Sequence, residues 1–382
     1  MSTLPTFTER LKQLIGTPSI SSANADLDMS NQAVVAILAE WFEQLEFDVE
    51  IHDITGSPGK QNMIARRGSG PGGLVLSGHT DTVPFDDTGW KSDPFKLFDS
   101  KQAFFGLGTS DMKGFFSVVI DAIQSLDSTD FSKPLTIVAT ADEECSMAGA
   151  RALGSAGVDQ AEVAIIGEPT DLAPIRMHKG IMMQAIRIRG QSGHSSNPHL
   201  GRSALDAMHD VLDALRIYRQ KMQSEYQNSG FEIAHPTLNL GSIRGGDNPN
   251  RICSHCDMEF DLRPLPGMSI TALREDIDAL VAPIANNHGV DIEHAPLFEG
   301  VEAFEQETDS ELVQSAETLS GKASESVAFA TEAPFFKSMG IHTLVLGPGS
   351  IDQAHQPNEF LPQKQIDPCS KLYRKLVQKY CL

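Results

Sequence analysis

Residues 73–84, which read GLVLSGHTDTVP, decide the fold. An apolar run of strand length ends at Gly78, and His79 and Asp81 follow before Pro84 closes the turn. In an open α/β sheet, the carboxyl end of such a strand opens into the ligand crevice. His79 is therefore placed to bind a metal ion, and Asp81 is placed to accept the other ring N–H and fix the tautomer. A histidine after a strand is more often an ordinary loop residue, so this interpretation depends on the rest of the chain.

The bulk composition is that of an ordinary globular protein. Of 382 residues, 40% are hydrophobic and 21% are charged, and this length suggests two domains. The net charge of −21 and the lack of a basic cluster argue against nucleic acid or an anionic membrane as a partner, and they are compatible with a cationic small substrate. The first residues, MSTLPTFTER, lack the regions of a signal peptide, and no apolar run approaches the roughly 18 residues of a spanning helix. We therefore expect a cytoplasmic protein.

The five cysteines are scattered and odd in number, so a disulfide framework is not expected. Cys253 and Cys256 form a C-x-x-C motif, but it falls within a predicted strand (251–262) and no second pair accompanies it. A structural role is favoured, with redox or zinc chemistry as the alternatives.

Residues 68–73, GSGPGG, fit the pattern G-x-G-x-x-G. A dinucleotide-binding fingerprint must follow a strand and open a helix. This segment precedes a strand and contains proline, so it predicts a turn.

Three further apolar segments are predicted strands, and each leads to an acid or a histidine. They are 135–140 before Asp142, Glu143 and Glu144; 162–167 before Glu168; and 343–346 before a Gly-Pro-Gly turn and His355. Consecutive carboxylates repel one another unless cations or protons neutralise them, although a solvated loop could tolerate that cost. Two histidines and several carboxylates at one sheet edge are the components of a metal site.

Asp111 lies just ahead of a predicted apolar helix, 115–126. Capping of the first helical turn is the simpler explanation for an aspartate at this position. The capping and metal-binding roles do not exclude each other, because a carboxylate has two oxygens. A site with mostly oxygen ligands plus imidazole suits Zn²⁺, Co²⁺ or Mn²⁺.

The segment 180–290 interrupts the pattern of buried strands. It predicts the order β-α-β-β-α-β, the ferredoxin-like arrangement. The predicted elements are 183–189, 202–226, 237–243, 251–262, 269–287 and 290–292. We therefore expect a catalytic domain in two parts, residues 1–179 and 291–382, with 180–290 inserted as a separate domain. In the first part, helices are predicted at 8–15 and 30–45, and strands at 47–51 and 62–65.

These motifs resemble those of the di-zinc aminoacylase/carboxypeptidase/deacetylase family. The family pattern is H-x-D, G-x-x-D-x-K-G, E-E, G-E-P-T and a late histidine; here the matching stretches are 79–81, 108–114, 143–144, 167–170 and His355. The resemblance spans essentially the whole chain. It implies an α/β fold, with a di-zinc aminopeptidase-like catalytic domain whose helices pack on a mostly parallel sheet, plus an inserted ferredoxin-like dimerisation domain.

The resemblance also implies the metal site. Asp111 would bridge two Zn²⁺ ions, for which Co²⁺ could substitute; His79 and Glu168 would complete one position, and Glu144 and His355 the other. Every one of these ligand positions matches the family pattern.

Three further residues receive catalytic roles from the resemblance. Asp81 would orient His79, and Glu143 would act as the general base. In the family, a histidine of the inserted domain reaches the active site of the partner in a homodimer and stabilises the oxyanion, and His194 matches it. A surface histidine in a Gly/Ser-rich turn is the alternative for His194.

The resemblance also implies residues that contact the substrate. Arg263 and Asn250 match positions that bind the substrate carboxylate, a group that suits a guanidinium fork. Glu332, with Thr331 beside it, is a candidate for recognising a cationic substrate side chain. The alternatives are a solvated arginine at a strand end for Arg263 and helix capping for Thr331 and Glu332.

Several stretches resemble the family members that hydrolyse N²-acetyl-L-ornithine to acetate and L-ornithine, a step of arginine biosynthesis. They are 177–180, 190–196, 250–253, 261–267, 331–335, 346–351 and 353–357. The alternatives within the family are N-succinyl-diaminopimelate hydrolysis and a broader activity on N-acyl amino acids or dipeptides. Outside it, they are a non-catalytic metal- or amino-acid-binding protein, against which Glu143 argues, and a dinucleotide-dependent oxidoreductase.

Overall fold

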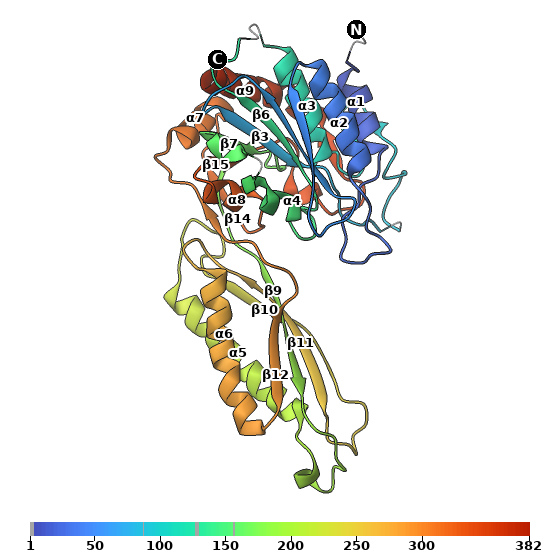
Figure 1. Cartoon of the computed structure of the whole chain (residues 1–382), viewed down its shortest axis with the longest axis vertical. Helices are drawn as coiled ribbons and strands as arrows, with labels where there is room; N and C mark the ends of the chain where they lie inside the picture. The colour runs from blue at the N-terminus through green and yellow to red at the C-terminus, as the bar shows by residue number, and fades with distance from the viewer. Residues whose placement is uncertain (1–3, 87, 127–129, 156) are drawn as a thin grey trace. The chain divides into compact units, whose positions relative to one another are not determined.

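The computed structural model describes residues 4–86, 88–126, 130–155 and 157–382. By its internal contacts the chain divides into two compact units (Figure 1). Unit 1 consists of Met1–Arg176, Gln306–Glu325 and Thr331–Leu382, and unit 2 of Met177–Glu305 and Ser326–Ala330. The chain thus passes from unit 1 into unit 2 and back twice, the second time only for residues 326–330.

Unit 1 is built on a mostly parallel sheet. Its strands are β1 (Asp48–Asp53), β2 (Gln61–Arg67), β3 (Leu74–His79), β6 (Leu135–Thr140), β7 (Val163–Ile166) and β15 (His342–Val345). They lie in the order β1-β2-β6-β3-β7-β15, and the four strands from β6 to β15 are parallel. β1 and β2 extend the sheet in antiparallel pairing, and β8 (Ile175–His178) begins beside β15, where Ile175 pairs with Val345. The sequence prediction of the fold class is confirmed.

The parallel strands are buried on both faces, which explains their continuous apolar runs. Leu74 and Leu76 of β3 belong to the main hydrophobic core, whereas Val75 and Ser77 point to the opposite face and are also buried. The helices that contribute to this core are α1 (Phe7–Ile15), α2 (Gln32–Gln44), α3 (Lys113–Gln124), α7 (Glu311–Ser320) and α9 (Gln363–Cys381). The central strands are therefore packed on both faces up to His79 and Thr140 at their carboxyl ends.

Short elements complete unit 1. They are β4 (Phe98–Asp99), β5 (Ala103–Phe105) and β16 (Phe360–Pro362), which form a small sheet; the helices α4 (Ala148–Arg151) and α8 (Ala333–Ser338); the 3₁₀ turns η1 (Ala152–Ser155), η2 (Val158–Gln160) and η4 (Ile351–Gln353); and β14 (Glu325–Val327), which runs into unit 2.

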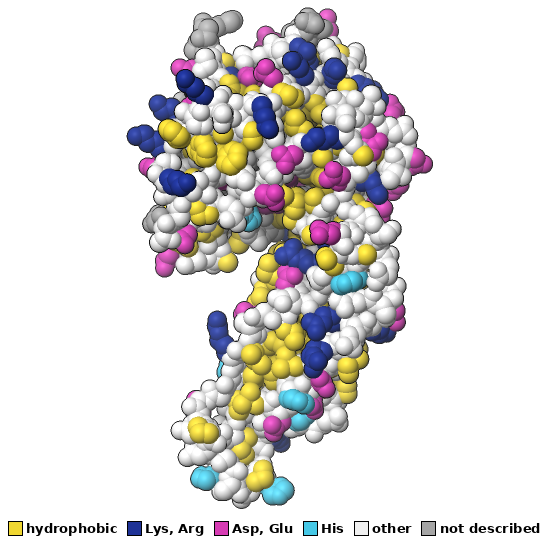
Figure 2. All heavy atoms as spheres, turned by 180° about the vertical axis from the view of Figure 1, so that it is seen from behind, with side chains coloured by type: hydrophobic (Ala, Val, Ile, Leu, Met, Phe, Trp, Pro, Cys, Tyr) yellow, Lys and Arg dark blue, Asp and Glu magenta, His cyan; other side chains and the backbone are white. Residues whose placement is uncertain are grey.

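Unit 2 has the element order β-α-β-β-α-β. Its main elements are β9 (Met182–Arg189), α5 (Ala204–Glu225), β10 (Thr237–Gly245), β11 (His255–Arg263), α6 (Ile270–His288) and β12 (Asp291–Pro296), with the short η3 (Pro198–Leu200) and β13 (Phe304–Glu305). The sheet order is β10-β11-β9-β12 with every pair antiparallel, as in a ferredoxin-like fold. Figure 2 shows apolar side chains among charged ones on the surface of this unit. Exposed apolar residues include Leu205 and Ile217 of α5 and Ile243 of β10.

The glycine-rich segment and the C-x-x-C motif both lie next to the start of a strand. Residues 68–73 form a turn with positive φ at Gly68, Gly70, Gly72 and Gly73, and they lead directly into β3, as predicted. The predicted strand 251–262 is wrong at its start, because β11 begins at His255. Residues before it bond to the neighbouring loop instead, with the Ile252 N–H donating to the Gly193 carbonyl at 2.9 Å. Cys253 therefore precedes the strand, and both thiols of the C-x-x-C motif are free.

Among the residues described, no helix has both the length and the apolar character needed to cross a membrane.

Candidate active site

The candidate site is assembled at the carboxyl ends of the parallel strands in unit 1. His79 is the last residue of β3, Glu143 and Glu144 lie in the turn after β6, and Glu168 lies two residues beyond β7. Because these strands are neighbours in one sheet, their ends present the side chains to a common space.

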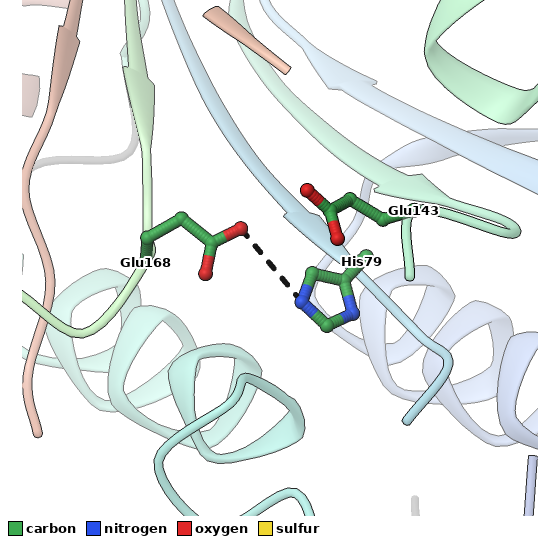
Figure 3. Close-up of side chains that lie close together, drawn as sticks. All are labelled: His79, Glu143 and Glu168. Atoms are coloured by element: carbon green, nitrogen blue, oxygen red, sulfur yellow. Dashed lines mark ion pairs between the residues drawn. The ribbon is translucent and has the colours of Figure 1, made fainter. Parts of the chain in front are cut away.

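One group of potential ligands consists of His79, Glu143 and Glu168, whose donor atoms all lie within 4.8 Å of one another. Figure 3 shows both carboxylates directed toward the imidazole ring from different elements. The Glu168 Oε1 lies 3.7 Å from the His79 Nε2. Glu143, which the sequence analysis expects to be a base and not a ligand, is thus close enough to the other two to act on anything they hold.

The second group consists of His79, Asp111 and Glu144, again within 4.8 Å. The Asp111 Oδ1 lies 3.1 Å from the His79 Nε2, and His79 is common to both groups. Asp111 is not the N-cap of α3; that position belongs to Met112, and it has no side-chain cap. His355 lies next to this group, with its Nε2 3.0 Å from Glu144 Oε2 and 3.5 Å from Asp111 Oδ2.

The tautomer of His79 follows from its hydrogen bonds. Its Nδ1 lies 3.0 Å from the backbone carbonyl oxygen of Asp81, and a carbonyl can only accept, so Nδ1 carries a proton. The Nε2 lone pair of the neutral ring therefore faces the Asp111 and Glu168 carboxylates. A lone pair aimed at carboxylates requires a proton or a metal cation between them.

The backbone oxygen of Asp81, at 3.0 Å, is nearer to the His79 Nδ1 than the side-chain Oδ1, which is 3.7 Å from the same nitrogen. Its carboxylate accepts the backbone N–H groups of Glu143 at 3.2 Å and Glu144 at 3.1 Å. Asp81 is fully buried and therefore ties the β3 end to the acidic turn after β6.

The electrostatics of the cluster fit bound cations. Burial raises the pKa of Glu168 well above its usual range, and the negative charge of Asp111 raises it further. Burial likewise raises the pKa of Glu143, with Glu168 adding to the effect. Burial alone would lower the pKa of His79, but Glu168 and Asp111 outweigh it and raise that pKa well above its usual range. The cluster carries more negative charge than its two histidines balance, and divalent cations would relieve this excess.

Glu332 lies beside this cluster and is 1% exposed. Burial raises its pKa to about 7, against the lowering effects of the Thr140 side chain and the His79 ring. The Thr140 hydroxyl is directed at the Gly78 carbonyl at 3.3 Å, and neither Glu332 oxygen has a hydrogen bond among the described residues. Thr331 Oγ1 accepts the backbone N–H of Ala333 at 3.1 Å, which supports the capping alternative for this residue.

The remaining predicted residues belong to unit 2. His194 and Asn250 lie in adjoining loops, since the Ser195 N–H donates to the Asn250 carbonyl at 3.0 Å. Arg263 is the last residue of β11, and its Nε donates to Asp261 Oδ1 at 2.9 Å. Ser196 donates to the His194 Nδ1 from its backbone N–H at 3.2 Å, and its hydroxyl lies 2.7 Å from the same nitrogen.

Glu359 was not predicted from the sequence; it is a buried carboxylate that contacts the backbone leading to Asp111. It lies four residues after His355, and no periodicity or motif distinguishes it from the other acids near the C-terminus.

Comparisons with known proteins identify the family of the chain. The chain is 46% identical to acetylornithine deacetylase of Proteus mirabilis over 99% of its length and 98% of that protein, and 47% identical to the Aliivibrio salmonicida enzyme of that name over 99% of both. Among solved structures, a tripeptidase from Staphylococcus aureus superposes with a TM-score of 0.76 at 18% identity, covering 98% of this chain and 97% of that one. A dinuclear metal-binding peptidase from Bacillus subtilis gives 0.67 at 14% identity, covering 97% and 96%. The model of peptidase family M20/M25/M40 matches residues 75–379, and the chain belongs to this family.

Proposed function

We propose that this protein is a metal-dependent amide hydrolase that converts N²-acetyl-L-ornithine to L-ornithine and acetate. The observation that carries the proposal is the convergence of imidazole and carboxylate groups at the carboxyl edge of the sheet, in a chain 46% identical over nearly its whole length to a protein named acetylornithine deacetylase. The reaction would serve arginine biosynthesis in the cytoplasm. N-succinyl-diaminopimelate, other N-acyl amino acids and dipeptides are the competing substrates.

The site suits two divalent cations. His79 and Glu168 would hold one, Glu144 and His355 the other, and Asp111, which lies between the two histidines, would bridge them. Zn²⁺ is the proposed ion, with Co²⁺ as a functional substitute, because the donors are imidazole nitrogens and carboxylate oxygens. Such a pair supplies Lewis-acid chemistry: it polarises an amide carbonyl and lowers the pKa of water.

Glu143 is the proposed general base. Its carboxylate lies with His79 and Glu168 but is not needed to complete either ligand set. It would take a proton from the attacking water and return it to the leaving amine. The backbone bond from Glu143 to Asp81 holds the residue in place for this transfer.

His194 is the proposed donor to the oxyanion of the tetrahedral intermediate, and Arg263 and Asn250 are the proposed contacts to the substrate carboxylate. His194 and Asn250 lie in loops that precede β11, whereas Arg263 ends it. The nine residues of β11 separate these positions by roughly 25 Å, too far for one small substrate to reach both within a subunit. We therefore propose that His194 and Asn250 act on the active site of the partner subunit.

A homodimer formed through unit 2 would satisfy this requirement. β10 lies at an edge of its sheet, and exposed Leu205, Ile217 and Ile243 offer apolar surface. These features support the proposed dimer contact.

Chelation and metal rescue test the proposed function. Protein treated with a chelator should lose acetate release from N²-acetyl-L-ornithine and regain it when Zn²⁺ or Co²⁺ is restored. Rescue only with N-succinyl-diaminopimelate or a dipeptide would keep the chemistry and replace the substrate. Bound metal without activity on any of these substrates would support the binding-protein alternative.

Glu332 is the proposed partner of the δ-ammonium group of the substrate, because it is a buried acid with unbonded oxygens beside the catalytic cluster. Kinetics of Glu332→Gln on N²-acetyl-L-ornithine and on N²-acetyl-L-norvaline, which lacks the ammonium group, test this role. The preference for acetylornithine, as a ratio of kcat/KM values, should fall about tenfold or more, since hydrogen bonds to charged groups contribute about 1.5–3 kcal/mol. An unchanged preference would exclude Glu332 from substrate recognition.

A further inference from the structure

Glu359 is a buried carboxylate whose hydrogen bonds all go to one short segment of backbone. It accepts N–H groups from Gly108 at 3.1 Å, Ser110 at 2.8 Å and Asp111 at 3.0 Å. The residue is 1% exposed. Three backbone N–H groups thus converge on one buried carboxylate.

The segment that it holds has no regular structure of its own. It joins the end of β5 at Phe105 to the start of α3 at Lys113, so sheet or helix bonding cannot satisfy its N–H groups. The two carboxyl oxygens accept all three bonds, with one oxygen serving Ser110 and Asp111 and the other serving Gly108. A glutamine would turn its NH₂ group toward one of these donors and lose that bond.

Further hydrogen bonds join residues 106–111 to the segment around Glu359. The Gly106 N–H donates to the backbone carbonyl of Glu359 at 3.0 Å, and the Ser110 hydroxyl donates to the carbonyl of Phe360 at 2.7 Å. His355 stands four residues before Glu359, and its Nε2 is 3.5 Å from Asp111 Oδ2. Glu359 therefore holds the backbone of Asp111 against the segment that carries His355.

We propose that Glu359 is a positioning residue that sets Asp111 and His355 at the separation needed to hold two metal ions together. The inference rests on the metal site of the proposed function and adds to it a residue outside the ligand set. Groups that orient metal ligands typically change metal affinity by about 10–100-fold when they are removed. Glu359 should act on metal binding in the same way, without touching substrate.

Metal titration of Glu359→Gln tests the proposal. Metal-free protein is titrated with Zn²⁺ against a chromophoric chelator, and the visible spectrum is recorded as Co²⁺ is added. The variant should bind the second equivalent of Zn²⁺ at least about tenfold more weakly than the native protein, with an altered Co²⁺ spectrum at two equivalents. The matched control is Glu317→Gln, whose carboxylate in the same unit accepts the backbone N–H of Ser324 at 2.8 Å and should leave both readouts unchanged.

Native affinity for both equivalents, together with a native Co²⁺ spectrum, in Glu359→Gln would overturn the proposal. Should that variant fail to fold, Glu359→Asp keeps the charge but shortens the side chain, and native metal binding in it would overturn the proposal equally. Native protein that binds no second metal would overturn the proposed two-metal site and this inference with it, whereas two metals bound with equal affinity by native protein and by the variants would remove the inference alone.

Discussion

The carboxylate of Asp81 accepts a hydrogen bond from the backbone N–H of Glu143 at 3.2 Å. Its other oxygen accepts the N–H of Glu144 at 3.1 Å, so a single buried side chain fixes the turn that presents both acids. Asp142 enters this turn with a φ of +61°, in the left-handed region. The backbone is thus set before any metal or substrate arrives, and the two glutamates can serve different roles.

Glu143→Ala should retain both metal ions and the dimer but lose activity by several orders of magnitude. The physical reason is that the general base and the route of the proton to the leaving amine are both removed; a positioned base typically contributes about 10²–10⁴-fold. Steady-state acetate release, with metal content measured on the same sample, checks this. Activity within tenfold of the native protein would show that the base has been assigned wrongly. Glu144→Ala serves as the comparison, because it should lose metal.

Asp81→Asn should weaken metal binding and activity together. The amide must turn its NH₂ group toward one of the two backbone N–H donors, which releases part of the turn that carries Glu143 and Glu144. We expect metal affinity to fall about 10–100-fold, as for other groups that orient ligands. Zn²⁺ titration measures the change, and native affinity in the variant would show that the backbone carbonyl of Asp81, bonded to His79, is its only important contact.

The positions of the candidate ligands could be predicted from the sequence because each depends on local pattern. β3 ends at His79 and β6 at Thr140, as the apolar runs indicate, and parallel neighbours bring their ends together. The order β-α-β-β-α-β of unit 2 follows equally from periodicity. Residue type and strand end were sufficient to place His79, Glu143, Glu144 and Glu168 in one cluster, whereas the position of Asp111 ahead of α3 also allowed a capping role.

What the sequence could not reveal depends on contacts between distant segments. Glu359 bonds to residues 108–111, and the Asp81 carboxylate bonds to the turn after β6; neither contact has a local signature. The start of β11 was predicted too early for the same reason, since Ile252 bonds to Gly193 across the loops instead of continuing the strand. Side-chain to backbone bonds of this kind are decided by tertiary packing.

Metal binding should strengthen as pH rises from 5.5 to 8. In the metal-free fold, burial raises the pKa of Glu332 to about 7 and that of Glu359 to about 8, and the Glu144 side chain raises that of His355 to about 9. The folded state therefore holds more protons than the unfolded state across this range, and the stability of metal-free protein falls as pH rises. At His355 a metal ion would take the place of the proton, and the charge of the bound ions disfavours protons elsewhere in the site, so the increase in Tm on adding two equivalents of metal should be larger at pH 8 than at pH 5.5. Thermal unfolding with and without metal at both pH values checks this, and an equal or smaller increase at pH 8 would contradict it.

Ser196 should set the hydrogen-bonding state of His194. A backbone N–H can only donate, so the bond from Ser196 makes the His194 Nδ1 an acceptor and places the ring proton on Nε2. That tautomer can donate to an oxyanion, and removal of such a donor costs about 10²–10³-fold in kcat. His194→Ala should therefore lower kcat by about that factor with little change in metal content.

Ser196→Ala removes the hydroxyl at 2.7 Å but leaves the backbone bond, so a smaller loss is expected. A decrease in kcat of about fivefold, the equivalent of about 1 kcal/mol, should occur with KM nearly unchanged. Ser195→Ala, at the adjacent position, is the matched control and should behave like native protein. In a double-mutant cycle, Ser196→Ala should have no effect once His194 is alanine, because the hydroxyl acts only through the ring. Equal effects in both backgrounds would separate Ser196 from His194, and loss of metal in His194→Ala would place that histidine in the coordination shell.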